Sequence, residues 1–237
     1  SIPLLFVIHG NARNAREYCF DWVESAQSYN FLVICPELDV LQFPTSEEFQ
    51  LGGIFKNNQI VDSTKWTFNY IEEIFNFLIS ENVTTNDSYG IYGHSAGSQF
   101  THRLALFTES KNASIFISAN AGWYTTIDFN ESFPYGLNNA PINEKELVEK
   151  FNYPLTILLG ENDTDPNASS LRKTEEAMRQ GIHRFDRGNY FYNMAKNKAS
   201  ELGVPFNWKL HTVANVGHSN TGMAPFAAQI FISNLNN

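Results

Sequence analysis

The sequence of 237 residues predicts an α/β fold with a mostly parallel sheet and helices on both of its faces. One observation is that short, continuously apolar runs alternate along the chain with longer segments of helical periodicity. A second is that the polar residues best suited to chemistry come directly after apolar runs, as they do at the carboxyl ends of parallel strands. We find no internal repeat or low-complexity linker, and we expect a single domain over residues 1–237.

The first third of the chain predicts two strands and two helices. Residues 4–8 are continuously apolar and indicate a buried strand that ends at His9-Gly10, and residues 16–29 follow as a helix. Residues 31–35 form a second short apolar run, which a proline closes. After a polar loop, residues 58–79 carry apolar side chains at helical spacing and predict a long helix.

The same alternation continues to the end of the chain. Apolar or alternating runs predict further strands over residues 88–92, 115–119, 155–159 and 206–213. Helical periodicity predicts further helices over residues 95–109, 144–150, 169–202 (interrupted around 181–188) and 224–234. The irregular, proline-containing part of residues 124–150 suits a short lid, although nothing in it is long and apolar enough for a lipase lid.

Composition and charge exclude several classes of protein. The chain is 43% hydrophobic and 14% aromatic, which is typical of a folded globular protein. Its net charge of −9 disfavours nucleic acid and anionic membrane surfaces as partners. Its apolar runs are too short to cross a bilayer. We therefore expect a soluble protein without a nucleic-acid or membrane partner.

Two cysteines and the start of the chain bear on the compartment. Cys35 ends an apolar run and is expected to be a small buried hydrophobe, and a disulfide with Cys19 is left open. The sequence has no initiator methionine and begins close to a strand, so we expect a trimmed chain. Secretion and a cytoplasmic location both stay open.

Ser95 is the strongest candidate for a nucleophile. It lies in Gly93-His94-Ser95-Ala96-Gly97, between an expected strand and an expected helix. Small residues two positions either side allow the tight turn of a nucleophile elbow, and the helix N-terminus favours negative charge on the reacting oxygen. The alternative is a serine that merely caps the helix.

A serine hydroxyl needs a general base, and histidine is the usual one near neutral pH. Among the six histidines, His218 follows the last expected strand in a loop that can reach back over the strand ends. The base in turn needs a carboxylate. Asp163 and Asp165 both follow the strand over 155–159, and we favour Asp163, because Asp165 precedes a proline and suits a turn cap.

The negative charge of a tetrahedral intermediate needs N–H donors. One is expected to be the backbone N–H of Ala96, the residue after the nucleophile. The other is expected from the loop after the first strand, where the N–H of Asn11 is best placed. An ordinary strand-to-helix turn is the alternative for this loop.

With these residues in hand, the chain resembles the α/β-hydrolase superfamily over nearly its whole length. The matching points are His9-Gly10, Gly93-x-Ser95-x-Gly97, Gly160-x-x-Asp163 and Gly217-His218, in the order nucleophile, acid, base. Within the superfamily it is similar to bacterial poly(3-hydroxybutyrate) depolymerase-like esterases, through stretches such as VICPELD, ANAGWYT and GENDTD. One departure is that members usually have strands before the His-Gly strand, which puts the sheet edge in doubt.

Two further groups bear on the substrate. Trp123 and Tyr124 follow the strand over 115–119 and are expected to form an aromatic wall of the cleft, with core packing as the alternative. Arg179, Arg184 and Arg187 form a basic cluster that suits surface salt bridges better than a carboxylate site.

The leading hypothesis is a serine esterase that acts on short-chain or polyester-type carboxylic esters through an acyl-enzyme. A serine peptidase on the same fold is one alternative, and a non-catalytic binding protein with a hydrolase fold is another. The hypothesis implies no organic cofactor and no metal ion. The sequence leaves the acyl group, the alcohol and the oligomeric state open.

Overall fold

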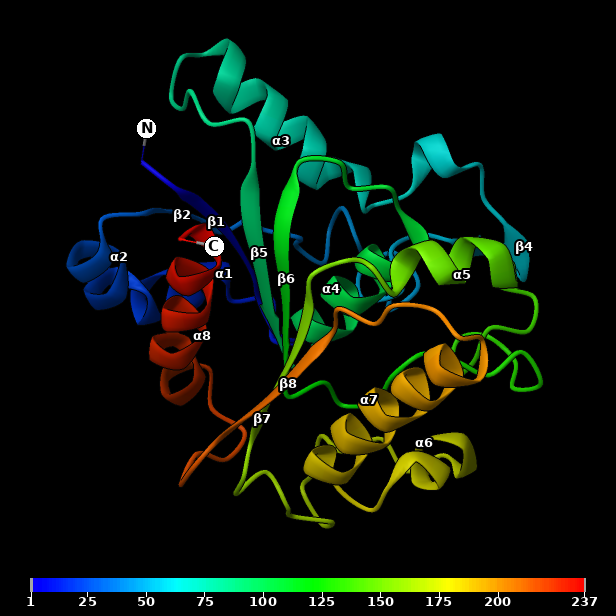
Figure 1. Cartoon of the computed structure of the whole chain (residues 1–237). Helices are drawn as coiled ribbons and strands as arrows, with labels where there is room; N and C mark the ends of the chain where they lie inside the picture. The colour runs from blue at the N-terminus through cyan, green and yellow to red at the C-terminus, as the bar shows by residue number, and fades with distance from the viewer. Residues whose placement is uncertain (1, 237) are drawn as a thin grey trace.

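A computed structural model describes residues 2–236 of the chain. Six parallel strands form one sheet in the order β2-β1-β5-β6-β7-β8 (Figure 1). Their bounds are β1 Leu4–Ile8, β2 Leu32–Ile34, β5 Tyr89–His94, β6 Ala113–Ala119, β7 Leu155–Gly160 and β8 Lys209–Val213. The predicted fold class, an α/β fold of the hydrolase type, is confirmed.

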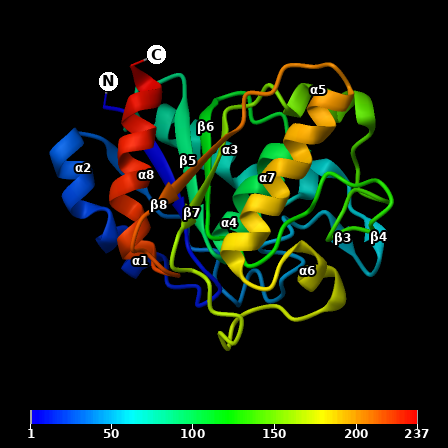
Figure 2. The same cartoon turned by 60° about the horizontal axis from the view of Figure 1, so that its bottom comes forward.

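Helices cover both faces of this sheet (Figures 1 and 2). One face carries α1 (Ala15–Asp21), α2 (Val23–Tyr29) and α8 (Asn220–Leu235). The other face carries α4 (Ala96–Phe107) and α7 (Arg184–Glu201). The remaining helices are α3 (Asn69–Ser80), α5 (Glu144–Lys150), α6 (Glu175–Gln180) and the short 3₁₀ helix η1 (Ser63–Lys65).

The alternation of side chains along β1 explains why two cores form. Leu4, Phe6 and Ile8 point into the larger core, where α4 and α7 pack. Leu5 and Val7 point to the opposite face and pack in a core that includes residues of α8. Every residue of β1 is buried, as expected for a strand in a parallel sheet covered on both sides.

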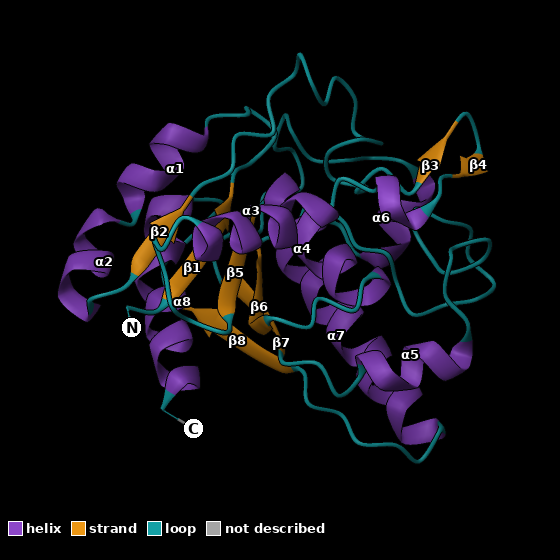
Figure 3. Ribbon diagram, turned by 90° about the horizontal axis from the view of Figure 1, so that it is seen from above, coloured by secondary structure: helices purple, strands orange, loops and turns teal. Residues whose placement is uncertain are grey.

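The helix predicted over residues 58–79 is wrong in its first part, because the helix begins only at Asn69. Residues 55–60 instead form a small antiparallel hairpin of β3 (Phe55–Lys56) and β4 (Gln59–Ile60), which lies away from the main sheet (Figure 3). Its turn residues Asn57 and Asn58 both have positive φ, 52° and 60°. Adjacent asparagines tolerate this left-handed backbone, so the signal for the hairpin was present in the sequence.

Three other predicted helices differ in their bounds. The helix over 16–29 is broken at Trp22, whose N–H bonds to the Cys19 carbonyl in a tight turn. The segment over 169–202 contains α6 and α7, separated at Gly181, where φ is 148°. The last helix begins four residues early, because Ser219 caps it and Pro225 is accommodated inside it.

Cys19 and Cys35 are joined by a disulfide, the pairing that the sequence left open, and Cys35 is partly rather than fully buried. The bond ties α1 to the chain just after β2, the edge strand. Within residues 2–236 no helix has the length and apolar character needed to cross a membrane.

The strand order places a topological switch between β1 and β5. The chain runs outward from β1 to β2 and then returns to add β5 on the other side of β1. Ile8 pairs with Gly93 across this boundary, so the segments that follow the two strands leave the sheet side by side. Crevices at such switch points are where open α/β sheets bind ligands.

Candidate active site

Ser95 lies at this switch point, on a sharp turn between β5 and α4. Its backbone has φ 59° and ψ −116°, outside the helical and extended regions, and its N–H bonds to the Ala119 carbonyl at 3.0 Å. A serine in such a conformation is the mark of a nucleophile elbow. The side chain is partly buried and is presented above the carboxyl end of the sheet.

The glycines around Ser95 are required by close backbone contacts. A Cβ atom on Gly93 would lie 2.1 Å from the Gly97 carbonyl oxygen, and one on Gly97 would lie 2.1 Å from the Ile8 carbonyl oxygen. Both contacts are with backbone, which cannot move aside cheaply. The spacing seen in the sequence therefore has a steric cause, which is the packing of the elbow on the end of β1.

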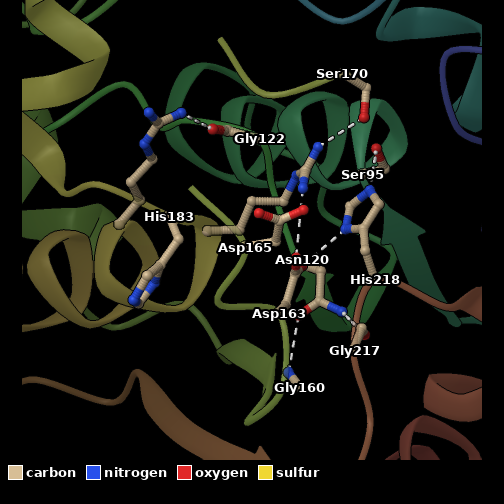
Figure 4. A network of polar contacts seen from close by, with 12 residues as sticks. Ser95, Asn120, Gly122, Gly160, Asp163, Asp165, Ser170, His183, Gly217 and His218 are labelled. Carbon is tan, nitrogen blue, oxygen red and sulfur yellow. Dashed lines mark hydrogen bonds and ion pairs between the residues drawn. The ribbon is translucent and has the colours of Figure 1, made fainter. Parts of the chain in front are cut away.

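The structure brings Ser95, His218 and Asp163 into one chain of hydrogen bonds (Figure 4). His218 Nε2 lies 3.0 Å from Ser95 Oγ, and His218 Nδ1 lies 2.7 Å from Asp163 Oδ2. Asp163 is 4% exposed, whereas the His218 side chain is 26% exposed. This is the arrangement in which a buried carboxylate fixes the tautomer of a histidine that can accept the proton of a serine.

Asn120, directly after β6, holds the loops of Asp163 and His218 together (Figure 4). Its Oδ1 accepts a hydrogen bond from the Gly160 N–H at 2.8 Å, and its Nδ2 donates to the Gly217 carbonyl at 3.1 Å. Gly160 ends the strand before Asp163, and Gly217 precedes His218. The amide is fully buried, so neither bond is exchanged for water.

Arg184, the first residue of α7, contacts the second oxygen of the Asp163 carboxylate. Its Nη1 lies 3.4 Å from Asp163 Oδ1, and both side chains are almost fully buried. Its Nη2 donates to Ser170 Oγ at 2.8 Å. Asp163 is therefore shared between a histidine and an arginine.

The predicted basic cluster is correct in part. Arg179 is exposed and pairs with Glu131, as a surface salt bridge should. Arg187 is fully buried and donates to the carbonyls of Gly181, Gly122 and Arg172. The prediction failed for Arg184 and Arg187 because the helical periodicity gives no indication that this end of α7 packs on the acid loop.

His94, the last residue of β5, packs against His218. Its ring centroid lies 4.7 Å from that of His218, and its Nδ1 lies 2.9 Å from the Tyr18 hydroxyl. Burial, followed by the charges of His218 and Arg184, lowers the pKa of His94 well below its ordinary value. His94 is therefore neutral at neutral pH, and it places no second positive charge beside His218.

The two expected oxyanion donors lie on adjacent segments. Ala96 is the first residue of α4, and first-turn N–H groups have no partner within a helix. Asn11 lies in the turn after β1, where Arg13 N–H bonds to the Gly10 carbonyl at 3.2 Å. A Cβ on Gly10 would lie 3.7 Å from Ser95 Cβ, so this turn lies beside Ser95.

Side chains of the first loop hold that turn in place. His9 Nε2 accepts from the Leu38 N–H at 3.1 Å. The Arg13 guanidinium donates to the carbonyls of Leu38 and Phe43 and lies 4.0 Å from the centroid of the Phe49 ring. His9 thus supports the loop that follows β1.

Trp123 and Tyr124 do not form the expected aromatic wall. Tyr124 is fully buried, and its ring stacks on Phe191 in the core. Trp123 is 5% exposed and packs between Tyr135 and the guanidinium of Arg103. The Tyr124 N–H donates to Gln180 Oε1, and Gln180 Nε2 donates to the Tyr124 carbonyl. These two bonds to a buried amide hold the segment against the protein interior.

The segment expected to form a lid folds back on itself. Thr126 N–H and Leu137 N–H bond to the carbonyls of Tyr135 and Asp128. The helix at its end, α5, begins with a capping box between Asn143 and Glu146. Within the described chain, no group of three or more His, Cys, Asp or Glu side chains is arranged to hold a metal ion.

Among the residues of the site, Asn120 was not singled out from the sequence, and Arg184 was named only as part of a surface basic cluster. The signal for Asn120 was its position directly after a strand, the same rule that identified Ser95 and Asp163. For Arg184 no local signal exists, because its partner is twenty-one residues earlier and the contact depends on how α7 packs.

No protein-family model and no curated protein matches the sequence. Among solved structures, poly(aspartic acid) hydrolase-1 from Sphingomonas sp. KT-1 is similar over 98% of this chain and 88% of its own, with 40% identity and a TM-score of 0.95. A poly(3-hydroxybutyrate) depolymerase from Bordetella parapertussis is similar over 98% of this chain and 79% of its own, with 29% identity and a TM-score of 0.93.

A more distant structure shares only the fold. S-formylglutathione hydrolase from Agrobacterium tumefaciens is similar over 99% of this chain and 84% of its own, with 15% identity and a TM-score of 0.60. Fold and similarity together place the chain in the α/β-hydrolase superfamily. Within it, the chain belongs to the family that includes poly(aspartic acid) hydrolase-1 and the poly(3-hydroxybutyrate) depolymerase-like hydrolases.

Proposed function

We propose that the chain is a serine hydrolase in which Ser95 is the nucleophile, His218 is the general base and Asp163 orients the base. The observation that carries the proposal is the pair of hydrogen bonds that joins Ser95 Oγ through the imidazole to the buried carboxylate. The elbow conformation of Ser95 gives independent support, because the rest of the fold must maintain such a backbone.

The geometry supports acyl transfer in two steps. Ser95 Oγ attacks a carbonyl carbon while its proton passes to His218 Nε2, and the N–H groups of Asn11 and Ala96 hold the developing oxyanion. The imidazolium then gives its proton to the leaving alcohol, and an acyl-enzyme remains. Water then attacks the acyl-enzyme ester while His218 takes its proton. The imidazolium returns this proton to Ser95 Oγ as the bond between Oγ and the acyl carbon breaks, and the acid product leaves.

Carboxylic esters of the short-chain or polyester type are the proposed substrates. The support is the similarity to a poly(3-hydroxybutyrate) depolymerase over nearly the whole chain. An ester needs nothing from the protein beyond the triad and the oxyanion donors, because an alkoxide is a far better leaving group than the amide anion that an unprotonated amide would release.

Amide hydrolysis is a second candidate, favoured by the 40% identity to poly(aspartic acid) hydrolase-1. The same groups serve it, with the difference that His218 must protonate the leaving nitrogen before the bond breaks. This candidate replaces the general peptidase alternative with a more specific substrate, a polyamide with carboxylate side chains.

The test is hydrolysis of p-nitrophenyl acetate, butyrate and octanoate by the wild type and by Ser95→Ala. Poly(3-hydroxybutyrate) and poly(aspartic acid) should be assayed in parallel with the same two proteins. A matched control is Ser80→Ala, because Ser80 is exposed at the end of α3. We expect Ser95→Ala to lose turnover of every substrate by at least about 10³-fold and the control to keep it.

The relative rates on the two polymers decide between ester and amide. Labelling by a fluorophosphonate should occur in the wild type and be absent in Ser95→Ala. Turnover no faster than the uncatalysed reaction in both the wild type and Ser95→Ala, with no labelling of either, would mean that Ser95 is structural and that the chain is a binding protein with a hydrolase fold.

A further inference from the structure

The two oxygens of the Asp163 carboxylate contact two cationic or potentially cationic groups. Oδ2 lies 2.7 Å from His218 Nδ1, and Oδ1 lies 3.4 Å from Arg184 Nη1. The serine-hydrolase mechanism needs only the first of these contacts. The second places a permanent positive charge on the far side of the carboxylate from the base.

Arg184 is held in this position from several sides. It is 3% exposed, and its Nη2 donates to Ser170 Oγ at 2.8 Å. The next residue, Phe185, donates its backbone N–H to the Asp163 carbonyl at 3.2 Å, which joins the start of α7 to the acid loop. The N-terminal end of α7, a helix of 18 residues, therefore faces the acid loop together with the guanidinium.

Charged and titratable side chains lie near His218 on several of the surrounding elements. Asp163 and the exposed Asp165 lie in the loop after β7, and Arg184 and Arg187 lie on α7. Asp21 lies at the end of α1 and accepts hydrogen bonds from Asn220 and Thr221, at the start of α8. Neutral His94 and its partner Tyr18 lie on β5 and α1. Of the two arginines on α7, Arg184 contacts the carboxylate of the acid, and Arg187 contacts backbone carbonyls.

We propose that Arg184 is a positioning residue that weakens the electrostatic interaction between the Asp163 carboxylate and the His218 imidazolium. This effect extends the pH range in which the site is active toward lower pH. The proposal rests on the roles of Ser95, Asp163 and His218 proposed above. Its physical basis is competition for one carboxylate, because the interaction energy that Asp163 gives to a protonated His218 is reduced by a cation on its other oxygen. A base that loses its proton more readily stays competent in more acidic solution.

The experiment compares the pH profile of kcat/KM on p-nitrophenyl butyrate for the wild type, Arg184→Gln and Arg184→Lys, at constant ionic strength. In Arg184→Gln, we expect the acidic limb to move to higher pH by about 0.5 to 1 unit. Arg184→Lys keeps the charge and should move the limb by less than half of that shift. The matched control is Arg179→Gln, which changes net charge equally at an exposed position on α6, and its limb should not move.

A second readout does not depend on turnover. The ring protons of His218 can be titrated by NMR in the same variants, with assignment by His218→Gln. If Arg184→Gln does not fold, Arg184→Met fills the same space without a buried amide and repeats the comparison. Equal limbs and equal His218 titrations in the wild type and Arg184→Gln would overturn the proposal.

Two other outcomes also count against it. A shift of the same size in Arg184→Lys and Arg184→Gln would show that packing rather than charge is responsible. A loss of kcat and thermal stability without any shift of the limb would show a structural role alone. If the wild type has no turnover that depends on Ser95, the proposed function fails, and the NMR titration still decides whether Arg184 controls His218.

Discussion

Asp163 and Asp165 lie two residues apart in one loop but in opposite environments. Asp163 is buried against His218 and Arg184, whereas Asp165 is exposed and accepts the Asn167 N–H at 2.8 Å. An acid that orients a general base must be shielded from water, because a solvated carboxylate gives little interaction energy to an imidazolium. The geometry therefore favours Asp163 as the acid and gives Asp165 the local turn.

Substitution of the two aspartates tests this assignment. We expect Asp163→Asn to lower kcat by about 10⁴-fold, because the amide cannot hold the imidazole in the required tautomer. Asp165→Asn is nearly isosteric and should leave kcat within about twofold of the wild type. Circular dichroism should show both variants folded, and the reverse pattern of activity would transfer the role of acid to Asp165.

The sequence was sufficient to place Ser95, Asp163 and His218 in one site, because each follows a strand and the carboxyl ends of parallel strands share one edge of the sheet. It was insufficient for Trp123 and Tyr124, which follow a strand equally well. Their side chains turn into the core because the buried amide of Gln180 binds the backbone of Tyr124. A contact of this kind is tertiary and has no local pattern.

At the scale of secondary structure, the disulfide joins a helix to the chain beside the edge strand of the sheet. β2 is the edge strand, and its one neighbour in the sheet, β1, leads directly into the loop that contains Asn11. Cys35 follows β2, and its bond to Cys19 closes a loop with a sequence separation of 16. Closing such a loop restricts the unfolded chain and so favours the folded one.

Loss of this disulfide should lower the free energy of unfolding by about 3 kcal/mol. The measurement is urea denaturation with and without reductant. The double variant Cys19→Ser, Cys35→Ser should match the reduced wild type and should not respond to reductant. An oxidised protein that is no more stable than the double variant would contradict the expectation.

Most elements could be predicted because their periodicity is strong. The strands over 4–8 and 155–159 are continuous apolar runs, and they are found within one residue of the expected ends. The hairpin of β3 and β4 was missed because two-residue strands have no measurable periodicity. There the only local signal is the turn itself, and the apolar spacing of the following helix concealed it.

At the scale of the whole molecule, buried histidines link folding to pH. Burial is the largest cause of a lowered pKa at His94 and at His102, both fully or nearly fully enclosed. In the unfolded chain these rings titrate near the ordinary value of 6.5. Below that pH the unfolded state binds protons that the folded state does not, so stability is present above about pH 6.5 and is lost as the pH falls.

The free energy of unfolding should therefore decrease between pH 7.5 and pH 5.5, a range in which most carboxylates stay ionised. His102→Gln should reduce that decrease, because one buried ring is removed. His211→Gln is the control, since His211 is exposed on β8. The measurement is urea denaturation at both pH values, and an equal decrease in the wild type and His102→Gln would contradict the explanation.

Few residue types could replace asparagine at position 120. Its backbone has φ 50°, a left-handed conformation that among the twenty residues is readily adopted by glycine, asparagine and aspartate. Its side chain must give one hydrogen bond and accept another on a single short planar group. Glycine has no side chain to bond with, and aspartate offers no hydrogen to the Gly217 carbonyl. The two demands together make asparagine the residue that suits the position joining the loops of Asp163 and His218.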